Sequence, residues 1–88
     1  MEIKVVYLSL ALDDLAYWKK SGNKAIQQRI SKLIQSIVET PFEGIGKPEA
    51  LKHNLKGYWS RRIDDEHRLV YKINENEIIV VSCRYHYR

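Results

Sequence analysis

The chain of 88 residues, 44% hydrophobic and 30% charged, has the composition of one small globular domain, which we expect to span residues 1–88. A net charge of +4, from 15 Lys and Arg against 11 Asp and Glu, permits an anionic partner but does not require one. The single cysteine, Cys83, excludes an internal disulfide and a cysteine-built zinc site, and favours the reducing cytoplasm. Residues 5–12 are apolar, but Asp13 and Asp14 follow at once, so we expect no signal peptide and no membrane span.

The first 22 residues predict a strand followed by a helix. Residues 2–7 are rich in β-branched types and alternate weakly, which indicates a short strand. A helix over about 10–20 follows, with Ser9 as its N-cap and Gly22 at its end. Its predicted apolar stripe consists of Leu12, Leu15 and Ala16.

A second helix is predicted between Asn23, a suitable N-cap, and Thr40. Thr40 precedes Pro41, and a residue before proline avoids the helical region of backbone space. The apolar residues of this segment recur at helical spacing and predict one buried face. They are Ile26, Ile30, Leu33, Ile34 and Ile37.

The second half of the chain changes to the two-residue period of β-strands. Two prolines and two glycines predict a loop over 41–50, after which there is room for a short strand around 50–54. Three longer strands are predicted over 57–63, 67–73 and 77–87, and turn-like segments at 64–66 and 74–76 join them.

If both turns hold three residues, residue 62 pairs with 68 and residue 72 pairs with 78. This register gives an apolar face of Trp59, Ile63, Leu69, Tyr71, Ile73, Ile79, Val81, Cys83 and Tyr85, with Arg61 and His67 near its rim. The opposite face carries a row of cations and consists of Tyr58, Ser60, Arg62, Arg68, Val70, Lys72, Ile78, Val80, Ser82, Arg84 and His86. We therefore expect an α+β fold, with two N-terminal helices packed on one face of a twisted, mainly antiparallel sheet of four to five strands.

The polar residues of this second half include the groups that RNA cleavage needs. When a 2′-hydroxyl attacks the neighbouring phosphate, an enzyme removes its proton, stabilises the added negative charge and protonates the departing 5′-oxygen. Glu49 is a candidate base and His86 a candidate acid, because an imidazole titrates near neutrality. Arg68, with Arg62 and Lys52, could hold the phosphate, and Tyr87, like Tyr58 and Tyr85, could stack on a base.

Simpler interpretations of the same residues stay open. A glutamate after a proline is usually only solvated, and a basic row on a strand is more often a solvated face than a nucleic-acid site. Cys83 falls on the apolar face, where a thiol is usually inert, and His53 and His67 have the character of structural or surface residues. The three histidines lack metal-binding spacing, so we expect neither a metal site nor a cofactor.

Six runs of residues resemble the YoeB (Txe/YoeB) toxins of the RelE superfamily, in the family's order and spacing. They are TPFEG (40–44), GKPE (46–49), LKHNL (51–55), GYWSRRI (57–63), EHRLVY (66–71) and CRYHY (83–87). The resemblance implies a bacterial toxin that cuts mRNA in the ribosomal A site and is neutralised by a YefM-type antitoxin. With that antitoxin it would bind operator DNA and repress its own promoter.

The resemblance also assigns roles to residues. It implies Glu49 as general base, His86 as general acid and Arg68 as the arginine that stabilises the transition state. Substrate-binding roles fall on Lys52, Arg62 and Tyr87. The family pattern ends at this tyrosine, whereas here Arg88 follows.

Two other functions remain open at this stage. One is a toxin like the related ParE group, which blocks DNA gyrase without cutting RNA, and the other is a basic module that only binds nucleic acid. A homodimer is also open, because nothing in the sequence decides the oligomeric state.

Overall fold

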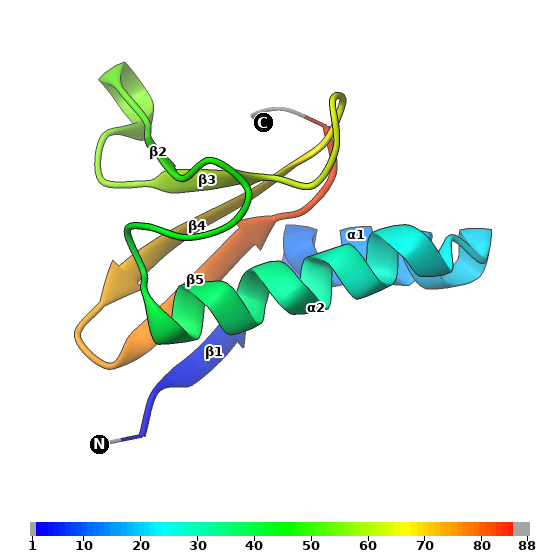
Figure 1. Ribbon diagram of the computed structural model, residues 1–88, viewed down its shortest axis with the longest axis horizontal. Coiled ribbons are helices and arrows are strands. Elements are labelled where there is room, and N and C mark those ends of the chain that lie inside the picture. Colours follow the sequence, from blue (N-terminus) through cyan, green and yellow to red (C-terminus); the bar gives the residue numbers. More distant parts are fainter. Residues whose placement is uncertain (1, 86–88) are drawn as a thin grey trace.

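In the part of the chain that the computed structural model describes, residues 2–85, five strands form one mixed sheet and two helices cover one of its faces (Figure 1). The helices are α1 (Ser9–Ser21) and α2 (Lys24–Glu39). The strands are β1 (Lys4–Tyr7), β2 (Glu49–Ala50), β3 (Trp59–Arg62), β4 (Arg68–Asn74) and β5 (Glu77–Ser82), in the spatial order β1-β5-β4-β3-β2. β1 runs parallel to β5, and the other pairs are antiparallel. This confirms the predicted α+β fold.

The helix ends follow local chemistry. The α1 helix ends at Gly22, whose φ of 73° lies in the left-handed region that glycine tolerates. The side-chain oxygen of Asn23 accepts a hydrogen bond of 3.1 Å from the backbone N–H of Ile26, so Asn23 caps α2 as predicted. The predicted cap at Ser9 is wrong, because Ser9 is already helical and Leu8 takes the cap position without a side-chain bond.

The sequence predicts the buried face of α2 correctly but not that of α1. In α2 the predicted face is confirmed, with Ile34 half-buried and the other four isoleucine and leucine residues buried. In α1 only Leu15 of the predicted stripe packs against the core, since Leu12 is 54% exposed and Ala16 is also exposed. The residues that α1 buries instead are Ala11, Asp14 and Trp18. The polar groups of the last two bind the backbone of the C-terminal segment, as described below, and that contact sets the orientation of the helix.

The strand register is confirmed at one turn and wrong at the other. Arg62 lies opposite Arg68, as predicted. Lys72 lies opposite Ile79 rather than residue 78, because the turn between β4 and β5 holds two residues instead of three. A slip of one residue moves every side chain to the other face. Ile78 and Val80 are therefore the buried pair.

A β-bulge restores the predicted parity near the end of β5. Tyr71 lies opposite Val80, whereas Val70 lies opposite Ser82, so Val81 is the extra residue. Cys83 consequently returns to the core, where it is fully buried as predicted. The bulge thus compensates for the shorter turn.

A fully buried arginine ties β3 to the loop between α2 and β2. The Arg61 side chain was expected near the rim of the apolar face, yet it is completely inaccessible to solvent. Its nitrogen atoms donate hydrogen bonds to the Ser36 and Tyr71 hydroxyls and to the carbonyls of Thr40, Pro41, Glu43 and Ile45. The last turn of α2 has no basic residue of its own, so Arg61 also supplies the cation that the negative end of the helix dipole favours.

Tyr71 completes this network from β4. Its hydroxyl accepts a hydrogen bond of 3.1 Å from Nε of Arg61 and donates one of 2.7 Å to the carbonyl oxygen of Pro41. Burial raises the pKa of this hydroxyl above its ordinary value, and the hydrogen bond from Arg61 offsets part of the rise. The hydroxyl therefore stays protonated near neutrality and keeps its donor role.

We predict that Arg61→Met destabilises the fold, because it keeps an apolar stem and leaves several buried or part-buried acceptors without a donor. Each unsatisfied buried group costs about 1–3 kcal/mol, so the free energy of unfolding should fall by about 3 kcal/mol or more. Urea denaturation followed by circular dichroism measures the loss. Arg62→Met, at the exposed neighbouring position, is the control and should shift stability by less than about 0.5 kcal/mol. Equal losses in both variants would contradict the structural role of Arg61.

Candidate functional site

The sheet register brings three of the predicted site residues onto one face. Glu49 lies opposite Ser60 across β2 and β3, and Arg62 lies opposite Arg68 across β3 and β4. Directly opposed residues of antiparallel strands project to the same face. Ser60 and Arg62 are two residues apart on β3, which keeps them on one face and places them ~7 Å apart. Glu49, Arg62 and Arg68 are therefore gathered on the same face of three neighbouring strands.

Glu49 lies in a strand rather than in the predicted loop. It begins β2, the short edge strand, and its side chain is exposed. The chain continues to Lys52, an exposed residue that precedes a 3₁₀ turn (His53–Leu55) within the connection to β3. Strand pairing thus fixes the backbone of the candidate base, and the candidate phosphate-binding lysine lies three residues beyond it.

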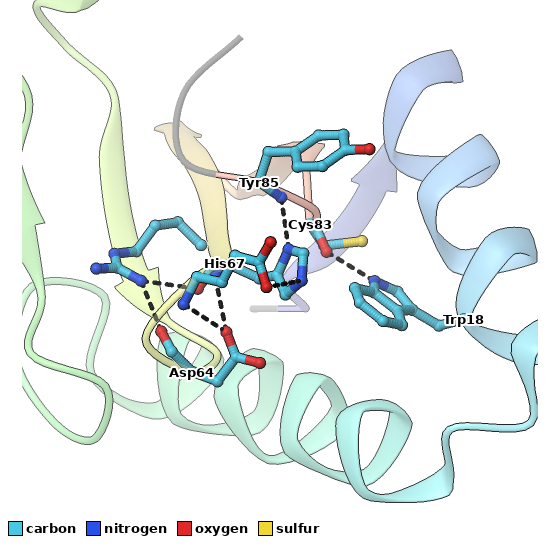
Figure 2. A network of polar contacts seen from close by, with 7 residues as sticks. Trp18, Asp64, His67, Cys83 and Tyr85 are labelled. Carbon is cyan, nitrogen blue, oxygen red and sulfur yellow. Dashed lines mark hydrogen bonds and ion pairs between the residues drawn. The ribbon is translucent and has the colours of Figure 1, made fainter.

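Arg68 and Arg62 occupy different environments. Arg62 is exposed, whereas Arg68 is only 7% exposed. The Nη1 atom of Arg68 donates hydrogen bonds of 2.6 Å to the carbonyl oxygen of Asp64 and 3.0 Å to that of His67 (Figure 2). Two backbone acceptors therefore orient the Arg68 guanidinium.

The turn between β3 and β4 is held by its own aspartate. The Oδ1 atom of Asp64 accepts hydrogen bonds from the backbone N–H groups of Glu66, at 2.9 Å, and His67, at 2.7 Å. This is the local bonding that makes aspartate common in turns. The turn predicted at 64–66 is therefore confirmed, and Asp64 supports Arg68 through its backbone and His67 through its side chain (Figure 2).

His67, the residue before β4, is bound to the C-terminal segment, a contact that the sequence did not reveal. Its Nδ1 atom accepts a hydrogen bond of 2.8 Å from the backbone N–H of Tyr85. The imidazole is nearly buried and meets the Trp18 ring edge-on, with 4.8 Å between the ring centres. The only sequence signal was its expected place at the rim of the apolar face, which did not distinguish this contact from simple packing.

Side chains of α1 hold Cys83, the residue that follows the last strand. The Asp14 carboxylate accepts a hydrogen bond of 2.9 Å from the backbone N–H of Cys83, and Nε1 of Trp18 donates one of 2.9 Å to the Cys83 carbonyl oxygen. Both backbone groups of Cys83 are thereby bound to a helix. The strand predicted over 77–87 therefore ends at Ser82.

The two residues after Cys83 leave the faces predicted for them. The Arg84 guanidinium lies over the Tyr17 ring of α1, 3.5 Å from its centre, and 4.5 Å from the centre of the Tyr85 ring. It therefore does not continue the cationic row. Tyr85 is 42% exposed and has a φ of 63°, so it is not the core residue that the register predicted. The contact with α1 has turned the chain out of the sheet.

The C-terminal site residues can be placed only in part. The described chain ends at Tyr85, whose carbonyl oxygen accepts a hydrogen bond of 2.7 Å from the backbone N–H of Arg68. His86 and Tyr87, together with Arg88, lie outside the described residues.

Between residues 2 and 85 no cluster of three or more His, Cys, Asp and Glu side chains could hold a metal ion. None of the helices in that range is long and apolar enough to cross a membrane.

Known proteins resemble the chain over nearly its whole length. Residues 7–87 match the family model of the YoeB-like toxin of bacterial type II toxin–antitoxin systems. The sequence is 48% identical to the toxin YoeB of Escherichia coli K12 over 85 residues, which covers 97% of this chain and 100% of that protein. It is also 48% identical to the toxin YoeB of Synechocystis over 86 residues, with 98% and 99% coverage.

Solved structures agree with the sequence match. A YoeB/ParE toxin from Agrobacterium tumefaciens superposes with a TM-score of 0.91 at 40% identity, covering 97% of this chain and 100% of that one. A YoeB dimer and a heterotetrameric YoeB–YefM complex, both from Staphylococcus aureus, give TM-scores of 0.89 and 0.87 at 43% identity, with 99% and 100% coverage. The chain therefore belongs to the YoeB family of type II toxin–antitoxin toxins.

Proposed function

We propose that this toxin is a ribosome-dependent endoribonuclease that cuts mRNA in the A site and so inhibits translation in the cytoplasm. The observation that carries the proposal is the sheet register, which collects Glu49, Arg62 and Arg68 on one face. Glu49 and Arg68 lie on strands that flank β3, two strand spacings or about 10 Å apart across the sheet. Long side chains can converge from both strands on a phosphate placed over β3.

The reaction follows from the chemistry of these groups. Glu49 removes the proton of the 2′-hydroxyl, and the 2′-oxygen then attacks the adjacent phosphorus. Arg68 stabilises the negative charge that develops on the phosphate oxygens, with Lys52 and Arg62 as further phosphate contacts. His86 donates a proton to the 5′-oxygen as the bond from phosphorus to that oxygen breaks. The products are a 2′,3′-cyclic phosphate, which water can open to a 3′-phosphate, and a 5′-hydroxyl.

The proposed partners follow from the relatives. A YefM-like antitoxin should bind and neutralise this chain, since the S. aureus relative forms a heterotetramer with YefM. Operator DNA should be bound only in the presence of that antitoxin. A homodimer is proposed for the free toxin, because the same relative has been solved as a dimer.

The mRNA base at the cut is held by Tyr87, and no cofactor takes part in the reaction.

Removing the base or the acid should slow cleavage strongly. We expect Glu49→Gln and His86→Ala each to lower the single-turnover rate on ribosome-bound mRNA by ~100–10,000-fold, the usual contribution of a general acid or base. Primer extension maps the cuts, with and without ribosomes. Glu75→Gln is the matched control for Glu49, because Glu75 lies in the β4–β5 turn, ~20 Å along the sheet from Arg68. This control should cut at the normal rate.

The ends of the RNA fragments report the mechanism separately from the rate. The 5′-hydroxyl of the downstream fragment should accept a phosphate from polynucleotide kinase without prior treatment. A 5′-phosphate there would contradict attack by the 2′-hydroxyl. If the wild-type protein leaves the message intact but inhibits gyrase, the ParE-like alternative holds. Undiminished toxicity of a variant that lacks both Glu49 and His86 would instead favour a nucleic-acid-binding module.

Expression of the toxin alone should arrest growth, and co-expression of a YefM-type antitoxin should relieve the arrest. Growth assays with inducible promoters measure both effects, and co-purification of the two chains tests the complex directly. Harmless expression of the toxin alone, at a level confirmed by immunoblot, would contradict the toxin activity.

A further inference from the structure

We propose that His67 is a positioning residue for the RNA-cleavage reaction, because its Nδ1 atom holds the backbone of Tyr85, the residue that immediately precedes the proposed acid His86. The inference rests on the proposed function. It assigns a role to a side chain that does not touch the reacting atoms and acts through the C-terminal segment.

The imidazole takes the place of a backbone acceptor. The Tyr85 carbonyl already accepts the backbone N–H of Arg68, at 2.7 Å. In a regular antiparallel ladder the Tyr85 N–H would bond in return to the carbonyl oxygen of Arg68. The Nδ1 atom of His67 supplies the acceptor instead.

The ring is held so that this atom points in a fixed direction. Asp64 fixes the His67 backbone through a hydrogen bond of 2.7 Å to its N–H. Trp18 packs edge-on against the imidazole and is itself bonded to the Cys83 carbonyl (Figure 2). Because Nδ1 accepts a hydrogen bond, the neutral ring carries its proton on Nε2, which lies 3.6 Å from the Glu66 carboxylate.

Tyr85 needs this anchor because its backbone is strained. Its φ of 63° lies in the left-handed region, which a residue with a bulky side chain adopts only where the surroundings enforce it. The bonds to His67 and Arg68 fix both backbone polar groups of Tyr85. Without the Nδ1 acceptor the strained conformation loses support, and relaxation of φ would change the direction in which the backbone leaves Tyr85.

Two substitutions separate the acceptor from the packing. His67→Asn places a side-chain carbonyl oxygen close to the position of Nδ1 but removes the ring. His67→Phe keeps an aromatic ring against Trp18 but has no acceptor. A role in packing alone predicts that the phenylalanine variant is the better enzyme, whereas a role as acceptor predicts the asparagine variant. Thermal unfolding of both variants establishes that they are folded.

We expect His67→Phe to lower kcat on ribosome-bound mRNA by ~10–100-fold with little change in KM, as a small misplacement of a catalytic group does. Its Tyr85 amide should also exchange with solvent at least ~10-fold faster than in the wild type. His67→Asn should retain most of the activity and most of the amide protection. Wild-type kcat in His67→Phe, or a larger loss in His67→Asn than in His67→Phe, would overturn the proposal.

A measurement on the wild-type protein keeps the anchor testable if a variant fails to fold. Imidazole ¹⁵N spectra at neutral pH should show His67 with its proton on Nε2 and an unprotonated, hydrogen-bonded Nδ1. A proton on Nδ1 would overturn the anchor whatever the enzyme does. Failure of the wild-type protein to cut ribosome-bound mRNA would instead overturn the proposed function and the role of His67 in it, while the spectra still report on the contact with Tyr85.

Discussion

The guanidinium of Arg61, buried without access to water, is the interaction on which the rest of the fold depends. A buried cation is tolerated only where hydrogen bonds replace its hydration, and here two hydroxyls and four backbone carbonyls do so. These acceptors come from α2, β4 and the loop after α2, so one side chain joins both layers of the domain. The same loop leads to Glu49, which links the stability of the core to the position of the proposed base.

Glycine is required where the loop approaches this arginine. Gly44 and Gly46 both have positive φ angles, of 120° and 83°. A Cβ atom at Gly44 would collide with the Ser36 hydroxyl, and one at Gly46 would lie 2.6 Å from a methyl group of Leu33. The loop therefore passes so close to α2 that side chains are excluded at these two positions.

How much the sequence predicts depends on how local the determining contact is. The buried face of α2, the cap at Asn23 and the pairing of Arg62 with Arg68 depend on residues close in sequence, and all three are confirmed. The face of α1 depends on the bond between Asp14 and Cys83, 69 residues apart, and was wrong. The predicted β4–β5 register was wrong, because an alternating sequence pattern reveals neither a turn that is one residue shorter nor an extra residue at a bulge. The strand that brings Glu49 onto the face of Arg68 was not predicted, and the chemical roles of these two residues and those of Lys52, His86 and Tyr87 remain predictions.

The pairing of β1 with β5 has a consequence for synthesis of the chain. Residues 4–7 lie against residues 77–80, and β5 lies between β1 and β4. The strand that is synthesised first, β1, therefore cannot pair until β5 has been synthesised. Contacts between residues this distant in sequence form slowly, and domains generally fold as units. A nascent chain therefore cannot complete its sheet until the C-terminal strand has left the ribosome that makes it. The topology thereby delays closure of the sheet at β5 until residues 77–80 have been made, although β2, β3 and β4 pair through contacts closer in sequence.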